Sequence, residues 1–133
     1  KQYCENALTV AKHLQASDKI ASVRYPALPG NEHYERAQKY LPLGTSGVMS
    51  IDIKGGRAPA MKFMDSLKLA CNEVHVADIR TCVLHPASET HRQLTDEQLV
   101  AAGIEPGLVR LSVGLENVED IIADLDQALA QLD

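Results

Sequence analysis

Apolar residues recur every three or four positions in three long segments, the spacing that places them on one face of a helix. These predicted amphipathic helices occupy residues 2–16, 59–70 and 118–132. The last segment has the most regular apolar stripe: Val118, Ile121, Ile122, Leu125, Leu129 and Leu132. Each stripe needs an apolar surface to pack against, so the three helices are expected to cover a sheet.

Two shorter helices are predicted from polar segments and capping residues. The segment 32–40 follows Asn31, a residue that can cap a helix, and its polar composition predicts a solvent-facing helix. Thr95 with Gln98 has the spacing of a capping box, which opens a short helix that Gly103 can end in the left-handed conformation.

Strands are predicted where apolar and polar residues alternate, or where a short apolar run stops at proline or glycine. These segments are residues 20–25, 49–53, 73–77, 81–85 and 108–113. In the last one, Leu108, Arg110 and Ser112 face one way, and Val109, Leu111 and Val113 face the other. Arg110 is therefore expected on the more polar face of the sheet.

The order of elements predicts an α/β (α+β) fold with helices packed against a mixed, mainly antiparallel sheet of four or five strands. No repeat or linker interrupts the pattern, and 133 residues suit one domain, so residues 1–133 are treated as a single domain.

Composition argues against several classes of binding partner. The net charge of -5 disfavours a nucleic-acid surface, and an aromatic content of 4% disfavours base-stacking platforms. Apolar runs are far shorter than the roughly 18 residues that a membrane helix needs. Three cysteines without a preceding apolar leader predict reduced thiols in a cytoplasmic protein.

A metal site is one candidate for the chemistry, because Cys71 and His75, Cys82 and His85, and nearby His91 have suggestive spacings. However, alternation along a strand sends Cys82 and His85 to opposite faces. Buried structural cysteines are therefore the favoured interpretation, and no metal is predicted.

Two further candidates have simpler interpretations. Ser88 and His91 resemble a nucleophile and its base, but no nucleophile-elbow glycines surround Ser88, so a turn role is favoured. Gly55 and Gly56 lack the rest of a phosphate-binding loop and are expected to end a strand.

Arg110 is the strongest candidate for binding. An arginine between apolar neighbours in a strand must reach solvent or an anion, and its planar guanidinium suits a bidentate contact with a carboxylate. A solvent-exposed edge arginine is the alternative.

The residues in 76–120 also resemble the C-terminal domain of the cystathionine γ-synthase family of pyridoxal phosphate (PLP) enzymes. The motif HPAS-x-TH stands at 85–91 and RLSVGLE at 110–116, in the family order. Upstream, RYPALPGNEHYERAQKYL and GVMSIDIKGG are similar to the family as well. The likeness is greatest to the O-acetylhomoserine sulfhydrylases of this family, and the fold it implies is the small C-terminal domain of a type I PLP enzyme.

The resemblance implies roles for particular residues. The arginine of the RLSVG strand grips the substrate α-carboxylate in the family, and this role transfers to Arg110. Many members place a substrate-lining serine ten residues before the HPAS histidine, where this chain has His75, which makes His75 a second substrate-binding candidate. The HPAS segment itself is expected to be architectural.

The resemblance also implies what is supplied from elsewhere. The family's Ser-x-Thr-Lys motif with the Schiff-base lysine does not occur, and Lys54 and Lys62 do not match it. With its start at Lys1, the chain is interpreted as the C-terminal part of a longer enzyme, without the cofactor domain, and is expected to be inactive alone and to bind no PLP.

The complete enzyme is expected to be a cytoplasmic homotetramer that converts O-acetylhomoserine and sulfide to homocysteine and acetate. A methionine γ-lyase, a cystathionine γ-synthase and a non-catalytic binding or oligomerisation module are the alternatives.

Overall fold

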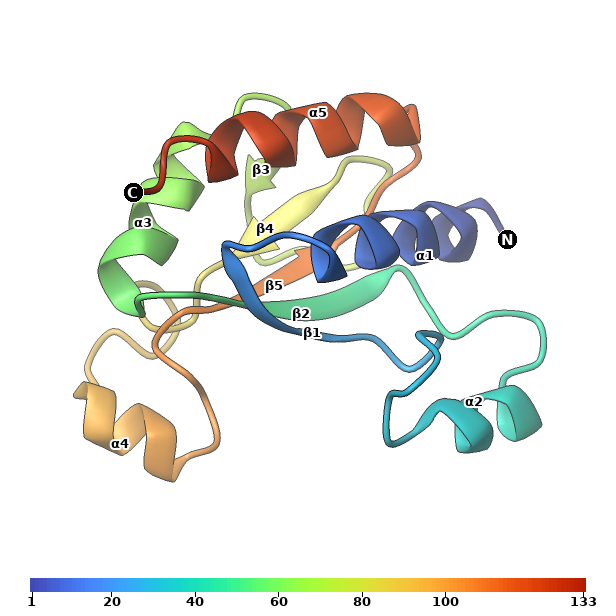
Figure 1. Ribbon diagram of the computed structural model, residues 1–133, viewed down its shortest axis with the longest axis horizontal. Helices are drawn as coiled ribbons and strands as arrows, with labels where there is room; N and C mark the ends of the chain where they lie inside the picture. The colour runs from blue at the N-terminus through green and yellow to red at the C-terminus, as the bar shows by residue number, and fades with distance from the viewer.

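A five-stranded sheet forms the centre of the molecule in a computed structural model that describes residues 1–133 (Figure 1). The strands are β1 (Ile20–Arg24), β2 (Val48–Ile53), β3 (Cys71–Asn72), β4 (Cys82–Leu84) and β5 (Leu108–Ser112). Their order across the sheet is β1-β2-β5-β4-β3, and every neighbouring pair is antiparallel except β3 with β4. The predicted mixed, mainly antiparallel sheet is confirmed.

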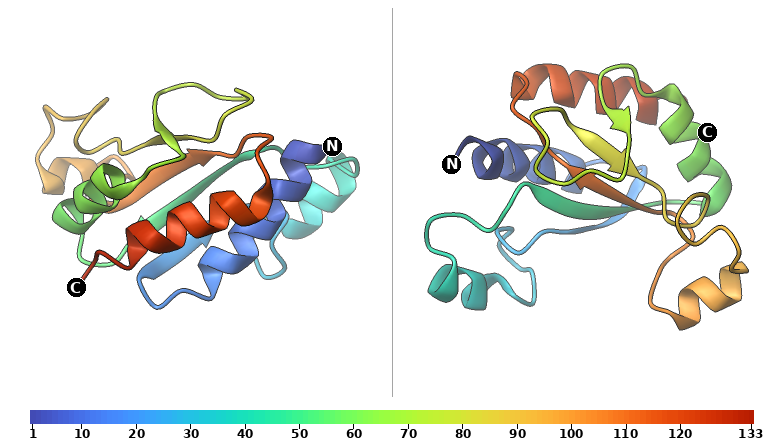
Figure 2. Two further views of the ribbon diagram at one scale, coloured as in Figure 1. Left: turned by 90° about the horizontal axis from the view of Figure 1, so that it is seen from above. Right: turned by 180° about the vertical axis from the view of Figure 1, so that it is seen from behind.

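Helices cover the two faces of the sheet unequally. The helices are α1 (Gln2–Gln15), α2 (Tyr34–Tyr40), α3 (Arg57–Ser66), α4 (Asp96–Ala101) and α5 (Val118–Leu129). Helices α1 and α5 lie side by side over one face, with α3 at its end, whereas α2 and α4 stand at opposite ends of the other side (Figures 1 and 2). The middle of that second face therefore has no helix over it. No helix is long and apolar enough to span a bilayer.

The hydrophobic core fills the space between the sheet and the three long helices. On the sheet side it contains alternate residues, for example Ile51 of β2 and Val109 and Leu111 of β5, each no more than 1% exposed. Phe63 of α3 and Leu125 of α5 are fully buried against this layer. Since side chains alternate along a strand, residues between these positions point to the face without long helices.

A polar residue is buried in α1, contrary to the predicted stripe. Asn6 is 3% exposed, and its amide donates to the carbonyl oxygens of Gly114 and Glu116 at 3.0 and 3.1 Å. The helix therefore turns Asn6 and Val10 inward and leaves Cys4 and Leu8 half-buried at the margin. These bonds join α1 to the turn that follows β5.

The outer strands of the sheet are irregular or short. The register of β1 against β2 shifts between Ile20 and Ser22. At the opposite edge, β3 contains only Cys71 and Asn72.

Two predicted elements are wrong in extent. Helix α3 ends at Ser66, not at 70, because the carboxylate of Asp124 accepts hydrogen bonds from the amides of residues 68–70 and draws this segment toward α5. Residues 73–77 do not form a strand. They belong to a loop that crosses the sheet, and only the two residues of β3 pair with β4.

The predicted caps have mixed outcomes. Thr95 and Gln98 form both hydrogen bonds of the predicted capping box. The structure also shows a cap on α5, where the side-chain oxygen of Asn117 accepts from the amide of Glu119. Asn31 does not cap α2. Its side-chain oxygen accepts a bond from the amide of His33 and forms a turn before the helix begins at Tyr34.

Candidate functional site

One row of side chains crosses the helix-free middle of the sheet. The register pairs Arg24 with Ser50, Ser50 with Arg110, and Arg110 with Leu84. Residues directly opposite one another in neighbouring strands point to the same face. The predicted placement of Arg110 on the polar face is therefore confirmed, and the sheet adds Arg24 and Ser50 to the same row.

This row forms the floor of an open depression of about 610 Å³. The walls come from Val48 and Leu108 of the sheet and from the segment after β4, which supplies Pro86, Thr90 and His91. The depression thus combines two guanidinium groups with hydroxyl, imidazole and apolar groups. Such a lining suits a small anionic molecule with a short apolar body.

The guanidinium of Arg110 is held from one side and free on another. Its Nη2 donates to the carbonyl oxygen of Val74 at 2.7 Å. Its Nε is buried and has no acceptor within the chain. A buried donor without a partner is unfavourable. Arg110 also lines the depression, so a carboxylate bound there would lie beside a guanidinium that has an unused donor.

The loop 73–80, which carries Val74, is fastened to the sheet at further points. The amide of Ala77 donates to Oγ of Ser112 at 3.1 Å, and the carbonyl oxygen of Ile79 accepts from the amide of Leu115 at 2.8 Å. At the end of the loop, the carboxylate of Glu116 accepts from the amide and hydroxyl of Thr81 at 2.6 and 2.9 Å. The RLSVGLE segment therefore supports both Arg110 and the loop above it.

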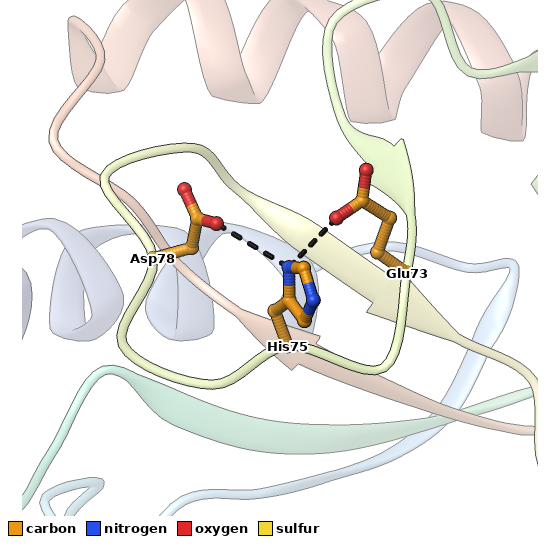
Figure 3. Close-up of side chains that lie close together, drawn as sticks. All are labelled: Glu73, His75 and Asp78. Atoms are coloured by element: carbon orange, nitrogen blue, oxygen red, sulfur yellow. Dashed lines mark ion pairs between the residues drawn. The ribbon is translucent and has the colours of Figure 1, made fainter.

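His75 lies on the same loop but does not line the depression. Figure 3 shows its Nδ1 facing two carboxylates, Glu73 Oε2 at 2.8 Å and Asp78 Oδ2 at 3.4 Å. Arg80 Nη2 contacts the same two oxygens at 3.0 and 3.1 Å. The hydrogen bonds from Arg80 hold the pKa of the Asp78 carboxyl well below its ordinary value of 3.8. The group is an ion-pair network on the loop.

The same geometry bears on metal binding. Glu73, His75 and Asp78 are close enough for their ligand atoms to share an ion. However, the guanidinium of Arg80 already contacts the two carboxylate oxygens that an ion would need. A second cation there would have to displace Arg80, so these residues do not fit a metal site.

Ser88 and His91 do not pair as a nucleophile and base, and Ser88 lies in a turn, as predicted. Ser88 Oγ lies 2.8 Å from Nδ1 of the fully buried His85, and His85 Nε2 lies 2.8 Å from the carbonyl oxygen of Pro106. A carbonyl only accepts, so Nε2 carries the proton and Nδ1 accepts from the serine hydroxyl. His91 Nδ1 instead lies 2.9 Å from Thr90 Oγ1.

His85 and Ser88 of the HPAS segment are therefore engaged in structural contacts. Both ring nitrogens of His85 are engaged, which leaves none to ligate a metal with Cys82. Cys71 and Cys82 are in register across β3 and β4, but His75 turns to its carboxylates. The cysteine and histidine residues considered for a metal site are not brought together as one.

Sequence reasoning missed several members of the site. Arg24, Thr90 and His91 line the depression with Arg110, and Arg80 organises the carboxylates around His75. Alternation in 20–25 does place Arg24 on the polar face, which was the available signal. Its position in one row with Arg110 depends on the strand order, which the pattern alone does not contain.

Comparison with known proteins agrees with this architecture. Residues 1–130 match the model of the family described as Cys/Met metabolism PLP-dependent enzyme. The chain is 45% identical over 130 residues to O-acetyl-L-homoserine sulfhydrylase 1 of Thermus thermophilus, covering 98% of this chain and 31% of that protein. It is 44% identical over 132 residues to L-methionine gamma-lyase of Porphyromonas gingivalis, covering 99% of this chain and 33% of that protein.

A solved structure has the same fold. The crystal structure of an O-acetylhomoserine (thiol)-lyase from Campylobacter jejuni, with N'-pyridoxyl-lysine-5'-monophosphate, superposes with a TM-score of 0.88 at 37% identity. The alignment covers 97% of this chain and 31% of that one. The chain thus spans about a third of the length of the relatives it matches. With a family match over nearly every residue and the fold in common, this chain belongs to the PLP-dependent enzymes of Cys/Met metabolism.

Proposed function

We propose that this chain is the substrate-carboxylate-binding domain of a PLP-dependent O-acetylhomoserine sulfhydrylase. The observation that carries the proposal is Arg110, whose guanidinium is oriented by Val74 and keeps a buried Nε–H without an acceptor. A substrate carboxylate would satisfy this donor and a neighbouring N–H in the bidentate geometry that arginine favours. The similarity to sulfhydrylases over 98% of the chain supports the same reading.

In the proposed reaction, acetate leaves the γ-carbon of O-acetylhomoserine and sulfide adds there to give homocysteine. Bound PLP supplies the electron sink for this chemistry. Arg110 contributes by fixing the α-carboxylate, which limits rotation of the substrate and sets the direction of its Cα–H bond. The apolar walls formed by Val48 and Leu108 would contact the carbon chain.

The cofactor is proposed to be held by polypeptide outside these residues. The two cations that line the depression are Arg24 and Arg110, and no lysine is among its ten lining residues. The residues here therefore do not fit a PLP Schiff base. We expect the chain alone to retain no PLP absorbance once free PLP is removed, and to lack turnover.

His75 is proposed as a second substrate contact, reached through movement of the loop 73–80. It directly follows Val74, whose carbonyl holds Arg110, and its side chain is 57% exposed. His75→Asn in the complete enzyme should raise KM for the amino-acid substrate and leave the α-carboxylate contact intact. An unchanged KM would remove His75 from the site.

The decisive experiment measures steady-state kinetics of the complete polypeptide with O-acetylhomoserine and sulfide. Arg110→Lys keeps the charge but loses the planar fork, so kcat/KM should fall about 10- to 100-fold, with KM raised. Arg36→Lys on α2 is the matched control and should retain normal kinetics. Normal kinetics for Arg110→Lys would overturn the assignment.

The substrate is tested with the same protein. We expect the complete enzyme to turn over O-acetylhomoserine with sulfide and to catalyse little elimination from methionine. Preferential methionine elimination would replace the sulfhydrylase proposal by a methionine γ-lyase, and a complete polypeptide without either activity would favour a binding module. Light scattering on the same sample tests the proposed homotetramer.

A further inference from the structure

Cys71 and Cys82 face each other across two neighbouring strands. They are direct partners in the register between β3 and β4. Adjacent strands lie about 4.7 to 4.9 Å apart, which falls inside the Cα separation of about 4.4 to 6.8 Å found in disulfides. Direct partners also point to the same face, so the two sulfurs lie on the same side of the sheet.

Both sulfurs contact Arg80, and they differ in access. Cys82 Sγ lies 3.6 Å from the Arg80 carbonyl oxygen, and Cys71 Sγ lies 4.0 Å from Arg80 Nη1. Cys71 is half-buried at the edge of the sheet, whereas Cys82 is 1% exposed. Burial also raises the pKa of the Cys82 thiol. An external reagent would therefore reach Cys71 first.

The surroundings of Cys82 are not those of a core cysteine. Its strand neighbour Val83 belongs to the hydrophobic core beneath α1 and α5, but Cys82 points to the opposite face. There it shares a row with Ser112, whose hydroxyl accepts a hydrogen bond from the amide of Ala77 in the loop 73–80. The loop, rather than the main core, covers this thiol.

We propose that Cys71 and Cys82 form a reversible disulfide when the protein meets a low-molecular-weight disulfide. Cys71 Sγ attacks one sulfur of the reagent, forming a mixed disulfide and releasing one thiolate. Cys82 Sγ then attacks the Cys71 sulfur, forms the intramolecular bond and releases the second thiolate. The two cysteine protons pass to the two released thiolates, so the cysteines are oxidised and one reagent disulfide is reduced to two thiols.

The resulting bond is expected to be easily reduced. Parallel neighbours hold their Cβ atoms near the strand spacing, whereas disulfides prefer a Cβ separation of about 3.5 to 4.5 Å. Strand β3 must therefore shift toward β4. Because β3 has two residues and only one neighbouring strand, it can make this shift while the rest of the sheet stays in place.

The bond would link Cys71 and Cys82, which flank the loop 73–80 on its two sides. This loop carries Val74, which orients Arg110, and it carries the ion pairs around His75. Oxidation would therefore restrict the segment that orients Arg110. The inference concerns these two thiols and does not depend on which substrate the complete enzyme uses.

The test treats the folded 133-residue chain with oxidised glutathione and follows it by intact mass and by peptide mapping without reductant. The expected product lacks two hydrogen atoms, joins Cys71 to Cys82, keeps one free thiol, and returns to the starting mass with dithiothreitol. Cys4→Ser is the control, since Cys4 lies on α1, and it should give the same cross-link. Cys82→Ser should stop at a glutathione adduct on Cys71.

Three results would overturn the proposal: a stable glutathione adduct on Cys71 of the wild-type chain, a cross-link that includes Cys4, or no reaction at Cys71. Hydrogen exchange supplies an independent measurement. Exchange of the amides in 73–80 should slow on oxidation of the wild type and stay unchanged for Cys71→Ser. Equal exchange in the oxidised and reduced wild type would contradict the proposed effect on the loop.

Discussion

The carbonyl oxygen of Val74 accepts a hydrogen bond from Nη2 of Arg110 at 2.7 Å, although the two residues are 36 positions apart in the sequence. The acceptor belongs to the backbone, so the orientation of the guanidinium depends on where the loop runs and not on the valine side chain. Anything that fixes or releases the loop 73–80 should therefore change how Arg110 is presented to a ligand.

Ser112→Ala should loosen this loop. Ser112 is 1% exposed and its hydroxyl accepts the amide of Ala77 at 3.1 Å. Without the hydroxyl that amide has no partner, so the free energy of unfolding should fall by about 1 to 3 kcal/mol in urea denaturation. Exchange of the Ala77 amide should also accelerate. Ser50→Ala, on the same face, should stay within about 0.5 kcal/mol.

Asp124→Asn tests the contact that ends α3. The carboxylate accepts from the amides of Lys68, Leu69 and Ala70 at 2.8 to 2.9 Å. An uncharged amide with one acceptor oxygen cannot serve all three, so the variant should lose about 2 to 3 kcal/mol in thermal or urea unfolding. Asp65→Asn, exposed on α3, is the control and should be near neutral. Equal losses in the two variants would contradict this role.

Asp124 also predicts a pH dependence. Burial of its carboxyl would raise the pKa, but the hydrogen bonds from residues 68–70 and Gln127 outweigh burial and lower it from 3.8. A lowered folded-state pKa contributes stability above the ordinary value, and this contribution disappears as the pH falls below 3.8. Unfolding free energies measured from pH 6 to pH 2 should therefore drop more steeply for the wild type than for Asp124→Asn.

Gly107 should tolerate no larger residue. A Cβ at this position would overlap the carbonyl oxygen of Ile53 and lie 2.8 Å from Asp52 Oδ1, where β2 and β5 meet. Gly107→Ala should therefore cost about 2 kcal/mol or more, because backbone must move. A Cβ at Gly103 would meet no atom within 4 Å, so Gly103→Ala carries only the backbone strain of a φ of 78°. A loss of about 1 kcal/mol in unfolding free energy is expected. A smaller loss at Gly107 than at Gly103 would count against the steric argument.

Ser88→Ala separates a structural role from a nucleophilic one. Ser88 satisfies Nδ1 of buried His85, so its loss should reduce unfolding free energy by about 1 to 2 kcal/mol. The kcat of the complete, folded enzyme should stay close to wild type. Ser22→Ala on β1 serves as the control for stability. A large loss of kcat in a folded Ser88→Ala enzyme would restore the nucleophile hypothesis.

Local patterns predicted the faces of the elements well and their ends less well. Alternation in β5 placed Arg110 on the polar face because a strand with one buried face leaves few alternatives. The predicted end of α3 was wrong because a distant residue ends the helix. The carboxylate of Asp124 lies 54 to 56 positions after the amides of residues 68–70 that it accepts from. Residues 73–77 have strand composition, yet backbone bonds to Ser112 and Arg110 make them a loop.

In the candidate site, too, local patterns identified some residues and long-range contacts decided the others. Arg110 was identified from one strand and one motif, and those are local properties. Arg24 became part of the site only through the order β1-β2-β5, which brings three separate segments into one row. Asn6 was missed because a buried amide interrupts an apolar stripe, and its partners at Gly114 and Glu116 are more than 100 positions away.

The irregular margins of the sheet have a consequence for how separate molecules meet. A long, regular outermost strand offers a continuous series of unpaired amides and carbonyls, on which further chains can add and grow into aggregates. Here the shifted register of β1 interrupts that series on one side, and β3 is too short to present one on the other. Neither margin therefore offers the long, regular strand on which a further polypeptide could stack.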